Sequence, residues 1–399
     1  MSNSLGTRPA RILVMDGHTR SALAVVRSLG QREDVEILAA SPKRWNMAGA
    51  SKYCARRLRC PDPEAGDFIS WINAAAREHN VDFLMATTDD SLTPLCARRG
   101  DLECGDALLP LPEPYFQLSD KLALLETAQK LGLKIPSSFI CRSREELESQ
   151  VRGLQFPAIL KPQWSRFIHE GRLVRTKVQP VVIAEDAMRM GAEHLAKGCG
   201  VCFQEVIEGE GVGYFALCDR GEVCAEFAHR RLLETRAAGG PSVVCESAQV
   251  TDAMRKAGRA LLGAADWNGP AMIEFKLDSR TGEPVLMEVN GRYWGSLALP
   301  VACGVDFPSL HFDLAVHGRK AEQAAYPLGK RVKWLLGLFA RTARDLAGGR
   351  EAGGVRTKRG GALANFFRLV FTRGDGMVFR FNDPLPALVE WLGLMERRG

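Results

Sequence analysis

The stretch Met272–Ser296, MIEFKLDSRTGEPVLMEVNGRYWGS, predicts two acidic strands joined by a turn. Glu274 follows a short apolar run, residues 278–284 have the Asp, Gly and Pro content of a turn, and a second apolar run leads into Glu288 and Asn290. Strand residues two apart share a face, so Glu288 and Asn290 are expected on the same side of the sheet. A register that opposes Glu274 to this pair would bring three oxygen ligands together.

Such a group of hard oxygen donors favours Mg²⁺, which keeps several waters and is usually completed by substrate phosphates. Arg292 lies two residues beyond Asn290 and would place a permanent, fork-shaped cation beside the metal if the strand continues. The alternative is a solvated hairpin with two ordinary surface acids. We prefer the metal site, because apolar residues surround both acids and Asn-Gly-Arg-Tyr-Trp is an unusual sequence for a solvated edge.

Length and composition are those of a globular protein with two or three domains: 399 residues, 46% hydrophobic and 25% charged. No apolar run approaches the length of a membrane span, and the N-terminus passes from a short polar tail into a strand. We therefore expect a cytoplasmic protein without a targeting segment. Cys199 and Cys202 form a CxxC without a second pair at zinc-finger spacing, so the eleven Cys are expected to be reduced, and this pair to be buried and structural.

The net charge of +6 is concentrated at the C-terminus, where residues 326–399 hold 14 Lys and Arg against 6 Asp and Glu. A local surplus of this kind disfavours a nucleic-acid-binding protein. In the same region basic residues adjoin aromatic and apolar runs, a pattern that suits contact with an anionic membrane surface. It more often forms helices packed on their own domain, which is our default expectation. A third alternative is a cover over the active site that shapes the acceptor pocket.

The first part of the chain alternates strands and helices as in a parallel α/β sheet that ends near residue 118. The expected strands are 11–15, 35–40 and 81–86, and the expected helices are near 23–29 and 67–78. Open α/β sheets bind ligands at the carboxyl ends of their strands. Asp89 and Asp90 follow such an end, where they either bind a ligand or cap the next helix.

Two lysines follow this domain at defined turns. Lys121 begins a predicted helix and Lys161 ends a buried strand, so the pair could clamp a polyphosphate. Residues 163–176 then contain several Arg and predict a basic loop over a charged ligand, or else a hairpin with an exposed basic face. Further on, residues 201–211 lead from an apolar strand into an acidic turn suited to holding a flat base. The Arg-rich segment 230–241, with its Gly-Gly-Pro breaker, is typical of a mobile loop that grips an anion.

In their order along the chain, these features resemble the ATP-grasp superfamily, in particular its carboxylate–amine ligases and carbamoyl-phosphate-synthase-like members. The resemblance covers residues 11–316, and Glu-x-Asn-x-Arg in MEVNGRYWGS is its most specific part. It implies an N-terminal parallel α/β (pre-ATP-grasp) domain followed by a two-subdomain α+β ATP-grasp fold and a mainly helical, basic C-terminal extension. The expected boundaries are 1–118, 119–200 (small subdomain), 201–325 (large subdomain) and 326–399.

Carried over by position, the resemblance implies ATP together with Mg²⁺ or Mn²⁺. It assigns the phosphates to Lys121 and Lys161, adenine to Gln204, Glu205 and Ile207, the metal to Glu274, Glu288 and Asn290, and the transferring phosphoryl group to Arg292. Arg231 and Arg236 are expected to help Arg292 stabilise an oxyanion. Where relatives carry a ribose-binding acid this chain has Gly211, so ribose is assigned to the neighbouring Glu210. Trp164-Ser165-Arg166 replaces the expected Gly-rich phosphate loop, and Arg166 is expected to do part of its work.

The implied activity is that of an ATP-dependent ligase, which activates a carboxylate as an acyl phosphate and joins it to an amine, releasing ADP and phosphate. Small-molecule acids and amines are the implied partners. One alternative is an enzyme of the carboxylase or carbamoyl-phosphate type that activates bicarbonate. Another is an ATP-binding scaffold that has lost catalysis, which the retention of both lysines, the three metal ligands and Arg292 disfavours.

Overall fold

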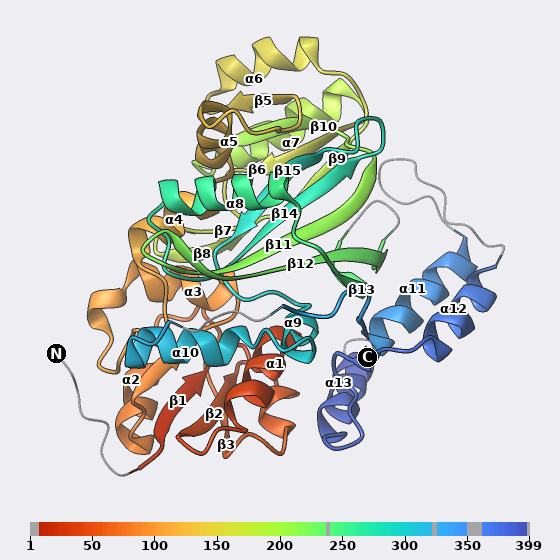
Figure 1. The fold of residues 1–399 in the computed structure, drawn as a ribbon. Helices are drawn as coiled ribbons and strands as arrows, with labels where there is room; N and C mark the ends of the chain where they lie inside the picture. Colours follow the sequence, from red (N-terminus) through yellow and green to blue (C-terminus); the bar gives the residue numbers. More distant parts are fainter. Residues whose placement is uncertain (1–7, 237–239, 321–324, 349–360, 397–399) are drawn as a thin grey trace.

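The computed structural model describes residues 8–236, 240–320, 325–348 and 361–396 (Figure 1). It contains a four-stranded sheet near the N-terminus, a second four-stranded sheet at the opposite end, and a seven-stranded sheet between them. This arrangement confirms the predicted fold class. None of the helices in the described ranges is long and apolar enough to cross a membrane.

The N-terminal sheet is parallel and has the order β3-β2-β1-β4. Its strands are β1 (Ala10–Val14), β2 (Val35–Ser41), β3 (Arg56–Arg59) and β4 (Phe83–Met85), with helices α1 (Arg20–Leu29), α2 (Phe68–His79) and α3 (Asp89–Ala97). The predicted strands are apolar and buried, whereas β3 has the sequence RRLR, which no apolar pattern marks as a strand. Asp16 joins the ends of β1 and β4, because its carboxylate accepts the backbone N–H groups of Thr87 and Thr88, each at 2.9 Å. Helix α4 (Pro112–Ser119) begins at a proline and runs across the boundary expected near residue 118.

The small sheet is antiparallel and has the order β5-β10-β6-β9. Its strands are β5 (Ser138–Cys141), β6 (Ala158–Pro162), β9 (Gln179–Val181) and β10 (Val201–Glu205), and its helices are α5 (Lys121–Lys130), α6 (Arg144–Gln150) and α7 (Ala184–Leu195). Because β10 pairs with β5 and β6, the chain leaves this sheet after Glu205, later than the boundary expected at residue 200. Cys199 and Cys202 are buried free thiols, as predicted.

The large sheet has the order β15-β14-β11-β12-β13-β16-β17. The strands are β11 (Gly209–Asp219), β12 (Glu222–Glu234), β13 (Ser242–Ala248), β14 (Gly269–Asp278), β15 (Pro284–Asn290), β16 (Arg331–Lys333) and β17 (Asp375–Gly376). Helix α8 (Asp252–Ala264) covers one face, and α9 (Ala298–Ala302) and α10 (Phe307–His317) lie on the other (Figure 1). Residues 230–241 were expected to form a mobile loop. This expectation is wrong for the first part of the segment, because β12 continues to Glu234 and carries Arg231. Residues 237–239 of that segment lie outside the described residues.

The C-terminal extension forms helices α11 (Leu335–Ala347), α12 (Ala362–Phe371) and α13 (Leu385–Glu396). Leu338 of α11 and Leu369 of α12 pack on β13, which confirms the default expectation for that face, while Phe371 stays exposed. Before α13, the buried Asp383 accepts hydrogen bonds from Arg27 Nε at 2.8 Å and Ser51 Oγ at 2.7 Å. The extension is thereby anchored to the N-terminal domain, and α13 lies beside it (Figure 1).

Candidate active site

The two acidic strands pair in the register that their sequence predicts. Glu274 on β14 lies directly opposite Glu288 on β15, and Asn290 Nδ2 donates to Glu288 Oε1 at 3.0 Å. The strand was expected to continue to Arg292, but it ends at Asn290. The side chain of Arg292 still reaches the same group, because its Nη2 donates to Asn290 Oδ1 at 2.9 Å. The four side chains thus form one polar cluster.

The two lysines reach this cluster from the small sheet and helix α5. Lys161 Nζ donates to the carbonyl oxygen of Met287 on β15 at 2.9 Å, and Lys121 Nζ donates to Ser165 Oγ at 2.8 Å. Both side chains are buried. Burial alone would raise the pKa of Glu288, but the charges of Lys121 and Lys161 outweigh it and lower that pKa. Glu288 is therefore held as a carboxylate between two cations.

Arg231 pairs with the other acid. Its Nη1 and Nη2 donate to Glu274 Oε1 and Oε2 at 2.7 and 2.5 Å, and Nη1 also donates to Glu234 Oε1 at 2.9 Å. A Cβ on Gly211 would lie 3.1 Å from Arg231 Cδ and 3.3 Å from Glu234 Oε1, so this glycine makes room for the pair. The acid that occupies the space at Gly211 is therefore Glu234, which the sequence analysis missed. Glu210, expected there, is exposed.

The donor set of Glu274, Glu288 and Asn290 fits a magnesium ion. Each carboxylate oxygen of Glu274 keeps a second lone pair beside its bond to Arg231. Within the described residues there is no group of three or more His, Cys, Asp and Glu placed to hold a metal. Two carboxylates and one amide make an incomplete shell, which suits an ion that keeps waters and takes its remaining ligands from substrate phosphates.

The residues expected at the adenine hinge differ in how many of their polar groups already form hydrogen bonds within the protein. Gln204 is buried and donates through Nε2 to Ser138 Oγ at 2.9 Å, while its Oε1 is buried and accepts no hydrogen bond from the described residues. Glu205 accepts the backbone N–H of Ser137 at 2.8 Å, and the Ile207 carbonyl accepts Lys276 Nζ at 2.8 Å. Gln204 is thus the member of the three with a free buried acceptor.

Asp89 and Asp90 connect the N-terminal domain to the segment after β15 and to the basic segment 163–176. Neither caps a helix, because α3 begins at Asp89 itself. Asp89 Oδ2 accepts Arg292 Nε at 2.7 Å, and Asp90 Oδ1 accepts Arg166 Nε at 2.5 Å and Arg175 Nε at 2.8 Å. Burial alone would raise the pKa of Asp89, but Arg292 outweighs it and lowers that pKa.

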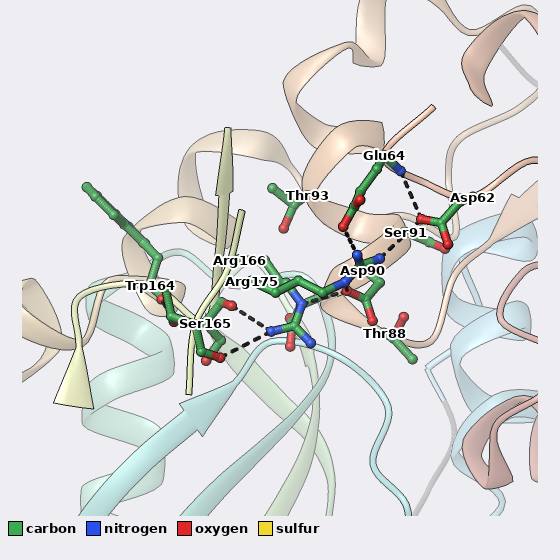
Figure 2. Close-up of polar contacts among 12 residues, drawn as sticks. Asp62, Glu64, Thr88, Asp90, Ser91, Thr93, Trp164, Ser165, Arg166 and Arg175 are labelled. Atoms are coloured by element: carbon green, nitrogen blue, oxygen red, sulfur yellow. Dashed lines mark hydrogen bonds and ion pairs between the residues drawn. The ribbon is translucent and has the colours of Figure 1, made fainter. Parts of the chain in front are cut away.

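The segment that replaces the Gly-rich loop leads into a hairpin, β7 (Arg166–His169) and β8 (Arg172–Arg175). Figure 2 shows Arg166 and Arg175 side by side over Asp90, with Asp62 and Glu64 completing the contacts of Arg175. The segment thus forms the hairpin of the alternative, with Arg172 and Arg175 exposed, but Asp90 pairs with both Arg166 and Arg175. Arg166 is engaged by Asp90 and by the Ser165 carbonyl, and Ser165 Oγ is the group that meets Lys121.

A cavity of about 340 Å³ adjoins the acidic cluster. It is lined by Arg20, His229, Arg231, Gly240, Pro241, Ser242, Met272, Glu274, Glu288, Asn290, Arg292, Trp294, Gly295 and Ser296. Three buried nitrogens of these residues, His229 Nε2, Arg231 Nε and Trp294 Nε1, have no hydrogen-bond partner in the part of the chain that the structure describes. Burial lowers the pKa of His229 well below 6.5, so its ring is neutral.

Unpaired buried polar atoms cost about 1–3 kcal/mol each. These three nitrogens have almost no accessible surface, so a ligand in the cavity would reach them only if neighbouring side chains shift. Sequence reasoning missed His229, whose only signal is its place at the end of an apolar run. Trp294 had the stronger signal, since it directly follows the most specific motif. Arg236 is exposed beyond the end of β12 and does not line this cavity, so it is the one predicted catalytic residue that the structure leaves apart.

Sheets in this order, with facing carboxylates and two buried lysines at their junction, are those of an ATP-grasp fold, and the comparisons with known proteins support the ATP-grasp superfamily. Within it, residues 204–338 match the family described as ATP-grasp in the biosynthetic pathway with Ter operon.

Carbamoyl phosphate synthase large chain from Methanosarcina acetivorans is 26% identical over 194 residues, which are 47% of this chain and 18% of the relative. The chain thus spans about a fifth of the length of the curated relatives it matches. Among solved structures, L-amino acid ligase from Bacillus licheniformis has a TM-score of 0.55 at 17% identity, covering 77% of this chain and 74% of that one. The biotin carboxylase domain of the Hydrogenobacter thermophilus 2-oxoglutarate carboxylase, solved with MgADP and bicarbonate, has a TM-score of 0.59 at 14% identity, covering 80% and 73%.

Proposed function

We propose that this protein is an ATP-dependent ligase that activates a carboxylic acid as an acyl phosphate and joins it to an amine. One observation carries the proposal: the polar cluster of Glu274, Glu288, Asn290 and Arg292 adjoins two buried lysines on one side and a cavity on the other, which Arg231 and Trp294 also line. A nucleotide-binding protein without a second substrate has no need for that cavity. The similarity to an L-amino acid ligase supports the same class of reaction.

For the nucleotide, we assign Lys121 and Lys161 to the phosphates, since they are the buried cations nearest Glu288. Gln204 Oε1 would accept the amino group of adenine, which satisfies its unused buried acceptor. The assignments of Glu205 and Ile207 to the hinge, of Glu210 to ribose, and of the four domains stay proposals. Glu234 is a second candidate for ribose because of its place at Gly211.

For the metal, Glu274, Glu288 and Asn290 would hold Mg²⁺. When bound, the ion supplies charge neutralisation for the nucleotide phosphates. Glu288 is already a carboxylate at neutral pH because the lysines lower its pKa, so no proton has to leave it before binding. Arg231 orients Glu274 by holding both of its oxygens.

In the first step, an oxygen of the substrate carboxylate attacks the γ-phosphorus of ATP, and ADP leaves with the bridging oxygen. In the second step, the amine attacks the carbonyl carbon, phosphate leaves, and the amine nitrogen loses a proton. Arg292 and Arg231 both line the cavity and would stabilise the negative charge that develops on the acyl oxygens. We retain Arg236 only as a proposed further anion-binding group at the exposed end of β12.

An ADP-release screen of acids crossed with amines tests this proposal, with hydroxylamine added to trap acyl phosphates. We expect ADP release that needs an acid, and a hydroxamate of that acid. Glu288→Gln should lower the rate by about 100-fold or more, because it removes a charged ligand from the site. Glu283→Gln, in the exposed turn before β15, is the matched control and should keep full activity. ATP hydrolysis without any hydroxamate from any acid would contradict the proposal.

The second candidate is an enzyme that phosphorylates bicarbonate, and the similarity to carbamoyl phosphate synthase and to a biotin carboxylase domain favours it. In that case ADP release would depend on bicarbonate and would need no organic acid. A catalytically inactive scaffold would instead bind ATP tightly without Mg²⁺ and release no ADP under any of these conditions.

A further inference from the structure

A second cavity, of about 580 Å³, lies between the N-terminal domain and the C-terminal extension. Its walls come from the loop and first turn of α1, the segment after β2, the start of α11, and α13. They comprise His18, Thr19, Arg20, Ser21, Lys43, Arg44, Trp45, Met47, Gly295, Trp334, Leu336, Val389, Glu390, Gly393 and Leu394. Arg20 and Gly295 line both this cavity and the smaller one beside the acidic cluster. The two cavities therefore meet at Arg20.

Arg20 is a cation whose hydrogen bonds in the described structure go to neutral groups. Its Nη1 donates to the Ser242 carbonyl oxygen at 3.1 Å and to Met377 Sδ at 3.3 Å, and its guanidinium lies 4.0 Å from the centre of the Trp334 ring. Burial lowers the pKa of Arg20 to about 10, so it is charged at neutral pH. Arg20 is partly buried, and Glu390 in the wall of the second cavity acts on it electrostatically. An anionic ligand at the junction of the cavities would add a counter-ion that pairs with the guanidinium directly.

Gly295 leaves space for such a group. A Cβ at this position would lie 3.1 Å from Arg20 Nη2, so any larger residue would crowd the second terminal nitrogen of the guanidinium. A carboxylate binds a guanidinium best through both terminal nitrogens. The glycine therefore leaves space beside Nη2 of Arg20, where both residues line the smaller cavity.

The rest of the second cavity suits an apolar body. The larger apolar side chains in its wall are Trp45, Met47, Trp334, Leu336, Val389 and Leu394. The acid in the wall, Glu390, accepts Trp334 Nε1 at 2.7 Å, and burial raises its pKa. Arg20 and Lys43 also line this cavity, and their charges favour an anion.

We propose that the second cavity binds the bulky apolar body of the acid substrate, whose carboxylate pairs with Arg20 where the two cavities meet. The identity of this ligand as the acid rests on the function proposed above. Its chemical class, an organic carboxylate with an aromatic or branched apolar body, follows from the lining alone. Bicarbonate or acetate would leave the two tryptophans without a contact.

Calorimetric titration of the full-length protein without nucleotide tests the assignment with three probes. 2-Naphthylacetate carries both the charge and the apolar body, 2-naphthylacetamide keeps the body without the charge, and acetate keeps the charge without the body. We expect saturable binding of 2-naphthylacetate, and binding at least about tenfold weaker for each of the other two. Equal affinity for the amide, or no saturable binding of 2-naphthylacetate up to its solubility limit, would overturn the proposal.

Two matched variants on α13 test whether 2-naphthylacetate binds in the second cavity. Val389→Phe fills the cavity from its wall, whereas Leu388→Phe makes the same kind of change at an exposed neighbour outside the lining. Binding of 2-naphthylacetate should weaken about tenfold or more in the first and stay unchanged in the second. Arg20→Gln should remove the preference for naphthylacetate over the amide while leaving amide binding intact. Unchanged binding in both Val389→Phe and Arg20→Gln would place the probe elsewhere and contradict the assignment.

The titrations and the ADP-release screen test the proposed site and the proposed function independently. If naphthylacetate binds as described but no acid supports hydroxamate formation, the proposed function is wrong and the anion site stands. If acids support hydroxamate formation in Val389→Phe as well as in the wild type, whatever their size, the ligase stands and the second cavity does not hold the acid.

Discussion

Trp294 presents a buried indole N–H at the wall of the first cavity, and no described residue accepts it. No protein hydrogen bond is lost in Trp294→Phe, but the smaller ring leaves a cavity at this buried position, so the free energy of unfolding should fall by about 1–2 kcal/mol. If the N–H binds the substrate, KM for the acid should rise about tenfold, as expected for the loss of one hydrogen bond. Steady-state kinetics and chemical denaturation measure the two effects. A large loss of stability with an unchanged KM would show that Trp294 is structural.

Single residues were predictable where the chemistry is local. Glu288 and Asn290 are two apart on one strand, and a hairpin register sets Glu274 opposite Glu288, so the geometry of this group followed from the period of a strand. The arginine partners were not predictable. Arg231 meets Glu274 across 43 residues and Arg292 meets Asp89 across 203, and no local pattern reports pairings at such separations.

At the scale of an element, the β7–β8 hairpin is clasped to the N-terminal domain by Arg166 and Arg175. These pairs are partly exposed, so each contributes roughly 0–1 kcal/mol and global stability should hardly change when they are removed. We expect Arg166→Gln with Arg175→Gln to accelerate amide hydrogen exchange in residues 166–175. Exchange in the wild type should also accelerate at high salt, because salt screens the clasp.

Arg172→Gln is the control for this experiment, since Arg172 is an exposed residue of β8 and is not one of the two clasp arginines. Hairpin exchange that is equal in the control, the double variant and the wild type would show that the clasp does not order the hairpin.

Among the elements, strands with apolar residues were predicted and those without were not. β3 is RRLR and lacks the pattern, and β12 was ended too early because Arg230 and Arg231 interrupt its apolar run. Both arginines sit on the strand because acids meet them there: Glu246 pairs with Arg230, and Glu274 pairs with Arg231. Cross-strand charge pairing overrode the local signal of a loop.

At the scale of the whole molecule, Asp383 holds the C-terminal extension on the N-terminal domain. Burial alone would raise the pKa of Asp383, but the hydrogen bonds from Ser51, Arg27 and the Lys52 backbone outweigh it and lower that pKa below the ordinary 3.8. A lowered pKa in the folded state means that the unfolded chain takes up the proton first as the pH falls. The stabilisation is therefore fully present above pH 3.8 and is lost as the pH drops through the folded-state pKa.

Asp383→Asn should lower the free energy of unfolding by about 3 kcal/mol at neutral pH, since it leaves the buried Arg27 without its counter-ion. The difference between variant and wild type should shrink below pH 3.8. Denaturation followed by tryptophan fluorescence between neutral and acidic pH measures both. A difference that is constant across this range would exclude the carboxylate as the titrating anchor.

The sequence predicted the order of the domains, and it left three alternatives for the C-terminal extension. The packing of α11 and α12 on β13 confirms the default for one face. Helix α13 and Trp334 line the second cavity, and the alternatives of a cover over the active site and of a membrane contact stay predictions. The position of the C-terminal extension depends on the contact between Arg27 and Asp383, which are 356 residues apart. Composition carries no information about such a tertiary contact.

The transfer of ¹⁸O from a labelled carboxylic acid to inorganic phosphate tests the central claim most directly. The acid that gives the fastest ADP release is labelled in both carboxylate oxygens and turned over with its amine in unlabelled water. If the carboxylate attacks the γ-phosphorus, one labelled oxygen leaves with the phosphate and each phosphate released carries a single ¹⁸O. Phosphate that carries no label from the acid, and instead takes its new oxygen from water, would contradict carboxylate activation at the site formed by Glu274, Glu288, Asn290 and Arg292.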